Sequence, residues 1–116
     1  MPVKFSRQKL SDQALELIAA RFRALSEPTR LKLIIALEEG EKNVSQLVQA
    51  TKATQANVSR QLQTLTDAGL VSRRKEGVSV FYQIADVAIF DMCHHVCGSL
   101  QKQLAQQGEA SKWFSF

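Results

Sequence analysis

The stretch TQANVSRQLQTLTDAGLVSRRKEGVSVFYQI, residues 54–84, changes its hydrophobic period midway, and this change decides the fold. In the first half, Val58, Leu62 and Leu65 recur at the three- and four-residue spacing of a helix. The second half, residues 71–84, has the pattern of two short strands. A helix followed directly by a β-hairpin is typical of a winged helix-turn-helix, in which that helix reads DNA and the hairpin is the wing.

The face of this helix opposite the apolar stripe is polar and carries little charge. Amides, a hydroxyl and a guanidinium are groups that can read base edges in the major groove of DNA. The side chains concerned are Gln55, Asn57, Ser59, Arg60 and Gln63. A merely solvated helix face would have the same composition, but the helix-turn-helix context favours the interpretation as a DNA-reading face.

The hairpin carries a run of positive side chains, Arg73, Arg74 and Lys75, and its turn is predicted around residues 75–77. Cations at this place suit phosphate oxygens better than base edges, so we expect all three to contact phosphates. The reading helix and the basic hairpin together predict a sequence-specific DNA-binding regulator. Its expected partner is double-stranded operator DNA.

Length and composition are consistent with this function. The chain has 116 residues, 45% of them hydrophobic, which fits a single domain over residues 1–116. Its net charge of +4 and pI of about 9.3 suit a polyanionic partner. No apolar run is long enough for a signal segment or a membrane span, so we expect a cytoplasmic protein with free thiols.

An enzyme is not expected. The sequence has no glycine-rich phosphate loop and no HExxH motif. It also has no nucleophile paired with a base outside the segment that contains the two cysteines.

Two flanking segments have narrow apolar stripes that are typical of helices packing against another helix. In the first segment, about residues 12–25, the stripe consists of Leu15, Ile18, Phe22 and Leu25. In the last segment, about residues 86–107, it consists of Phe90, Cys93, Cys97, Leu100 and Leu104. We therefore expect a mainly α protein with a small β-hairpin, which forms a homodimer through its first and last helices.

Helix ends are marked by polar residues and by glycine. Ser26 is expected to cap the helix that begins near Pro28, Thr54 the reading helix, and Asp86 the last helix. Gly69 is expected just beyond the end of the reading helix, where a positive φ is common.

Four segments in combination resemble the ArsR/SmtB family. They are Leu25–Leu31 (LSEPTRL), Asn57–Leu62 (NVSRQL), Ala68–Val71 (AGLV) and Val80–Ile84 (VFYQI). The resemblance covers about residues 12–100. It implies a homodimeric winged-helix repressor whose first and last helices form the interface. Such proteins bind operator DNA near promoters and leave it when an effector binds, often a metal ion or a thiol-reactive agent.

The known effector residues of this family are not found at the matching positions. Arsenic- and cadmium-sensing members carry Cys-Val-Cys where this chain has Asn43-Val44-Ser45. Zinc-sensing members bind metal along the last helix. Asp86 matches the first acidic position there, but Ala88, Ser99 and Lys102 stand at the other ligand positions. We expect both metal sites to be absent.

Cys93 and Cys97 are the remaining candidates for an effector site, and two interpretations of them are open. They lie four residues apart, on one face of a helix, and with His94 could bind a soft metal ion or metalloid or react with a thiol-reactive effector. Alternatively, both are packing residues of the seam, and the regulator acts without an effector. A winged-helix module for protein–protein contact is a third possibility, although the uncharged reading face counts against it.

Overall fold

The computed structural model describes residues 9–114, without the side chains of residues 110 and 111, and the chain divides into two compact units after Ala85. The first unit begins with helices α1 and α2, followed by a short strand β1, the helices α3 and α4, and the hairpin β2–β3. Their bounds are Asp12–Ala24, Pro28–Glu38, Lys42–Asn43, Val44–Thr51, Gln55–Asp67, Val71–Glu76 and Ser79–Ile84. The winged helix-turn-helix expected from the sequence is confirmed.

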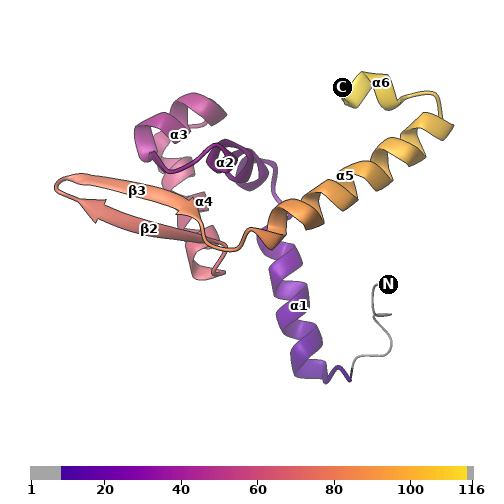
Figure 1. Cartoon of the computed structure of the whole chain (residues 1–116), viewed down its shortest axis with the longest axis horizontal. Helices are drawn as coiled ribbons and strands as arrows, with labels where there is room; N and C mark the ends of the chain where they lie inside the picture. Colours follow the sequence, from indigo (N-terminus) through magenta and orange to yellow (C-terminus); the bar gives the residue numbers. More distant parts are fainter. Residues whose placement is uncertain (1–8, 115–116) are drawn as a thin grey trace. The chain divides into compact units, whose positions relative to one another are not determined.

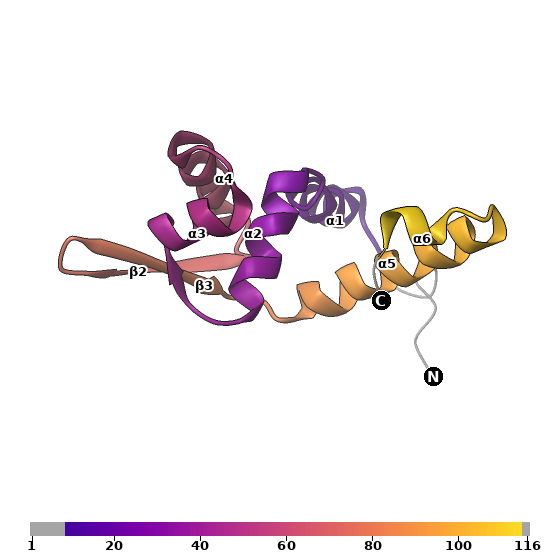
Figure 2. The same ribbon diagram turned by 90° about the horizontal axis from the view of Figure 1, so that it is seen from above.

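Helices α2, α3 and α4 pack against one another and against the hairpin, which extends beyond them (Figures 1 and 2). Leucines dominate the interior, because α2, α3 and α4 each direct one apolar side inward. The fully buried large side chains of this unit are Leu33, Ile34, Leu47, Val58, Leu62, Leu65 and Leu70. The apolar stripe predicted for the reading helix, α4, is therefore its core face.

The sheet has three antiparallel strands in the order β1-β3-β2. Strand β1 was not predicted, because two residues carry no readable alternation. Its register places Lys42 opposite Tyr82. The hairpin turn is also tighter than predicted. Lys75 and Glu76 belong to β2, and Gly77, with φ of 61°, takes the left-handed conformation at the turn.

Two helix caps differ from the sequence prediction. The N-cap of α2 is Glu27 and not Ser26, because Pro28 occupies the first helical position, and the Glu27 carboxylate accepts the Arg30 backbone N–H at 3.1 Å. The N-cap position of the last helix is Val87. Asp86 still contributes there, since its carboxylate accepts the Ala88 backbone N–H at 3.0 Å. The Thr54 cap and the positive φ of Gly69 are confirmed.

The second unit consists of α5, Ala88–Gln106, and the short α6, Ala110–Trp113. These two helices pack on each other. Cys93 and Cys97 lie on α5, and both are free thiols and half-buried. Within residues 9–114, no helix has the length and apolar character needed to cross a membrane.

Candidate nucleic-acid interface

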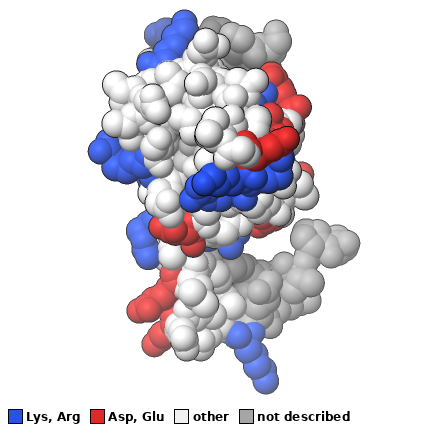
Figure 3. All heavy atoms as spheres, turned by 90° about the vertical axis from the view of Figure 1, so that its left-hand side faces the viewer, with Lys and Arg blue, Asp and Glu red and all other residues white. Residues whose placement is uncertain are grey.

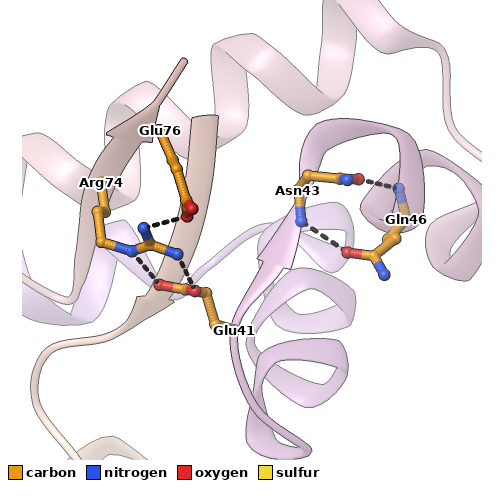
Figure 4. A network of polar contacts seen from close by, with 5 residues as sticks. All are labelled: Glu41, Asn43, Gln46, Arg74 and Glu76. Carbon is orange, nitrogen blue, oxygen red and sulfur yellow. Dashed lines mark hydrogen bonds and ion pairs between the residues drawn. The ribbon is translucent and has the colours of Figure 1, made fainter. Parts of the chain in front are cut away.

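The α3–turn–α4 unit is held by local hydrogen bonds at each helix start. Asn43 and Gln46 form a reciprocal capping box at the start of α3, and their bonds are 2.9 and 2.8 Å long (Figure 4). Lys52 turns the chain with a left-handed φ of 59°. Thr54 then accepts the Asn57 N–H at 3.1 Å to begin α4. The reading helix therefore starts from a geometry fixed by its own side chains.

Helix α4 is divided sharply between a buried and an exposed side. Val58, Leu62 and Leu65 are fully buried. Most of the predicted DNA-reading side chains are exposed, and Asn57 is half-buried: the exposed ones are Gln55, Ser59, Arg60 and Gln63. The structure therefore brings all five predicted residues onto the solvent side or its edge, as base reading requires.

Several of these side chains are already engaged within the helix. The Arg60 guanidinium donates to the amide oxygen of Asn57 at 2.9 Å. The Gln63 amide donates to the Asp67 carboxylate at 2.8 Å. Such contacts restrict side-chain rotation, and pre-ordered side chains lose less entropy when a surface binds a partner.

Two residues that the sequence prediction missed connect to this face. Gln61 donates to the Asn57 amide oxygen at 3.1 Å and accepts from the Arg30 guanidinium at 2.6 Å. Arg30 also donates to the backbone oxygens of Ala24 and Arg23, at 2.7 and 3.2 Å. The spacing of Asn57 and Gln61 on one helix was a readable signal. The contact with Arg30 was not, because it joins residues 31 positions apart.

The three wing cations are not equivalent, contrary to expectation. Side chains alternate along β2, so Arg74 lies on the opposite face from Arg73 and Lys75. Its guanidinium lies between the carboxylates of Glu41 and Glu76, at 2.6 and 2.5 Å (Figure 4). Arg73 and Lys75 form no ion pair with any described residue and are exposed.

Arg74 also lies over the Phe81 ring, 5.0 Å from the ring centre, and Phe81 is its partner in the β2–β3 register. The hydrogen bonds from Arg74 lower the pKa of the Glu41 carboxyl, and those carboxylates raise the pKa of Arg74. In Figure 3, which faces the end with the hairpin turn, positive side chains lie directly beside negative ones. The arrangement favours Arg73 and Lys75 for phosphate contact and gives Arg74 a role in joining β2 to the segment before β1.

The second unit contains the candidate effector residues. Cys93 and Cys97 share one side of α5, and desolvation raises the pKa of the Cys93 thiol. Nowhere in the described part of the chain do three His, Cys, Asp or Glu side chains lie close enough to hold a metal ion. Cys93, His94 and Cys97 do not form such a group within one protomer, and metal binding by them stays a prediction. On a helix, His94 is rotated away from the face that both thiols share.

The family described as "Bacterial regulatory protein, arsR family" matches residues 27–73. A transcriptional repressor SmtB homolog of Synechocystis sp. is 37% identical over 78% of this chain and 68% of its own length.

Solved structures have the same fold. Rv0081 of Mycobacterium tuberculosis matches with a TM-score of 0.74 and 28% identity, covering 84% of this chain and 98% of that one. A homodimeric winged helix-turn-helix DNA-binding domain, Mb0332 of Mycobacterium bovis, matches with a TM-score of 0.72 and 29% identity. That match covers 84% of this chain and 93% of the Mb0332 fragment.

Proposed function

Because this chain belongs to the ArsR family of bacterial regulatory proteins, we propose that it is a homodimeric transcriptional repressor that binds operator DNA through α4 and the β2–β3 wing. Its role is regulatory and not catalytic, and it acts in the cytoplasm, where bacterial DNA lies. The observation that carries the proposal is the division of α4 into a buried apolar side and an exposed side of amides, a hydroxyl and a guanidinium.

The dimer is proposed from the apolar side chains that the first unit leaves exposed. Leu15 and Phe22, on the predicted stripe of α1, are 43% and 55% exposed in the single chain. Large apolar side chains that recur along one side of a helix are typical of an interface. A two-fold dimer places two copies of α4 about 34–36 Å apart, one turn of DNA, on an inverted-repeat operator.

The direct test is fluorescence anisotropy with DNA from the promoter region of the protein's own gene and with scrambled DNA of equal length. We expect preferential binding to the promoter DNA, and an affinity that falls steeply with salt. Equal affinity for both DNAs would contradict sequence-specific binding. Absence of binding to either would favour a module for protein–protein contact.

Replacing Arg60 with alanine removes a base-reading guanidinium, and we expect operator binding to weaken by about 1–3 kcal/mol with relaxed sequence preference. Lys102→Ala removes the same charge from the exposed surface of α5 and is the matched control. Affinity is measured by anisotropy against the operator and against single-base variants of it. If Arg60→Ala keeps the wild-type preference, Arg60 is not a base-reading residue.

The wing provides a second comparison, between Arg73→Gln and Arg74→Gln. Arg73 has no carboxylate partner among the residues that the structure describes, so we expect its loss to lower the slope of log affinity against log salt by about one unit per wing. Arg74 is already paired with two carboxylates, so its loss should change the slope less. Equal changes in slope would show that Arg74 also binds phosphate.

We further propose that the thiols of Cys93 and Cys97 respond to the effector, because they lie four residues apart on one side of α5. Wild type, Cys93→Ser and Cys97→Ser are compared for operator release by an oxidant, a persulfide donor, As(III), Cd(II) and Zn(II). We expect release in the wild type alone. Because desolvation raises the pKa of Cys93, its thiolate fraction and its alkylation rate should increase only at a higher pH than for an ordinary cysteine thiol. Unchanged release in both variants would leave the cysteines as packing residues.

A further inference from the structure

A chain of hydrogen bonds sets the direction in which the Asn57 side chain faces. It begins at the end of α1, where Arg30 donates to the backbone oxygens of Arg23 and Ala24. It continues from the Arg30 Nη1 to the Gln61 Oε1, at 2.6 Å, and from the Gln61 Nε2 to the Asn57 Oδ1, at 3.1 Å. The Arg60 Nη2 donates to the same Asn57 oxygen, at 2.9 Å.

The chemistry of the two arginines makes this chain directional. A guanidinium has five donors and no acceptor, so the atom of Gln61 that faces Arg30 must be its oxygen. The amide nitrogen of Gln61 then faces Asn57 and donates a hydrogen bond. Asn57 must therefore accept this bond with its side-chain oxygen. Arg60, an exposed side chain, donates to the same Asn57 oxygen and adds to this preference. A side-chain amide can often exchange the positions of its oxygen and nitrogen by rotation, but the Asn57 amide has one favoured orientation here.

In that orientation, the Asn57 oxygen is occupied twice, while the amide nitrogen donates to no described residue. A free asparagine pairs with adenine, using its oxygen as acceptor and its nitrogen as donor together. Asn57 lacks the free acceptor for that pairing. Its available groups are two N–H donors, and these match base edges that present only acceptors in the major groove, the guanine O6 and N7 or the thymine O4.

We propose that Arg30 and Gln61 are positioning residues that hold Asn57 as a hydrogen-bond donor, so that the operator presents guanine or thymine where Asn57 meets it. This inference rests on the proposed function, since it assigns a base preference to one residue of the proposed DNA-reading face. It gives Arg30 a role beyond joining α1 to α2, because the contact reaches the reading helix through Gln61.

The test is selection of binding sites from a randomised DNA library by the full-length protein, with Asn57→Asp and Gln61→Glu compared with wild type. Asn57→Asp keeps both accepted hydrogen bonds and loses the donor, so the preference for guanine or thymine at one base position should fall about tenfold. That position identifies the base that Asn57 meets.

Gln61→Glu makes a sharper prediction. The new carboxylate still accepts from Arg30 but cannot donate to Asn57, and two facing oxygens repel each other. The Asn57 amide should then rotate so that its nitrogen donates to the new carboxylate, while its contact with the exposed Arg60 is lost and its oxygen faces the DNA. The base preference then reverses toward the donor edges of adenine or cytosine. Gln49→Glu is the matched control. It adds the same charge at an exposed position of α3 outside the hydrogen-bond chain, and we expect the wild-type preference.

The outcomes separate the inference from the proposed function. If the wild type enriches no sequence, the proposed function is wrong. The wild type could instead select a site with adenine or cytosine at one position, and Asn57→Asp could abolish that preference. In that case the assignment of Asn57 as a donor is wrong. An unaltered preference in Gln61→Glu, with an unfolding temperature near that of the wild type, would overturn the positioning role. The Asn57→Asp result stands alone if Gln61→Glu does not fold.

Discussion

Phe22→Asp is expected to convert the protein to a monomer and to weaken operator binding by about 10²–10⁴-fold, the gain that linking two binding modules usually provides. The physical reason is that Phe22 is 55% exposed on the apolar stripe of α1, where we propose that the partner chain packs. A carboxylate at that place would have to lose its water on dimerisation. Analytical ultracentrifugation measures the oligomeric state, and anisotropy measures the affinity.

Leu17→Asp is the matched control for this experiment. Leu17 is on the same helix and is also exposed, at 68%, but it lies roughly opposite the stripe of Leu15 and Phe22 by helical spacing. We expect it to remain a dimer with nearly wild-type affinity. Dissociation of both variants would show that the interface is broader than the stripe. A dimeric Phe22→Asp would exclude this side of α1 from the interface.

Leu62→Ala is expected to lower the free energy of unfolding by about 2–5 kcal/mol. Leu62 is fully buried on the inner side of α4, so its loss removes apolar contacts and leaves a cavity between the reading helix and the core. Because a domain of this size has a total stability of about 5–15 kcal/mol, the change should be visible as a large shift in denaturation midpoint. Urea denaturation followed by circular dichroism measures it.

The control here is Leu17→Ala, the same chemical change at an exposed position, for which we expect a change within about 0.5 kcal/mol. Both variants must be compared at one protein concentration, because dimerisation makes stability depend on concentration. If the two variants cost the same, the packing of Leu62 against the core is not the source of stability at this position.

Local patterns predicted the fold well where a single segment contained all the information. The buried stripe of α4, its Thr54 cap and the positive φ of Gly69 all follow from neighbours within one helix turn. The α2 cap was misplaced by one residue, because Ser26 and Glu27 can both accept a hydrogen bond and only Pro28 decides between them. Strand β1 was missed because its existence depends on pairing with β3.

For the candidate site, the sequence identified which side chains face away from the core, but not how they are paired. In the sequence, Arg73, Arg74 and Lys75 are three consecutive positive residues, and their charge does not distinguish one from another. The carboxylate that distinguishes Arg74 comes from Glu41, 33 positions away. Gln61 was passed over because it differs little from its neighbours in composition. Its importance comes from Arg30, on another helix.

The sequence by itself determined the switch from helix to hairpin, the buried and polar sides of α4, and hence the class of molecule that this face can bind. These follow from hydrophobic period, which acts between residues close along the chain. The tertiary structure alone decided which wing cations remain free and which end of the Asn57 amide points outward. Both depend on hydrogen bonds between residues far apart in sequence. Only the packing of α2 on α4, and the pairing of both β1 and β2 with β3, bring those partners together.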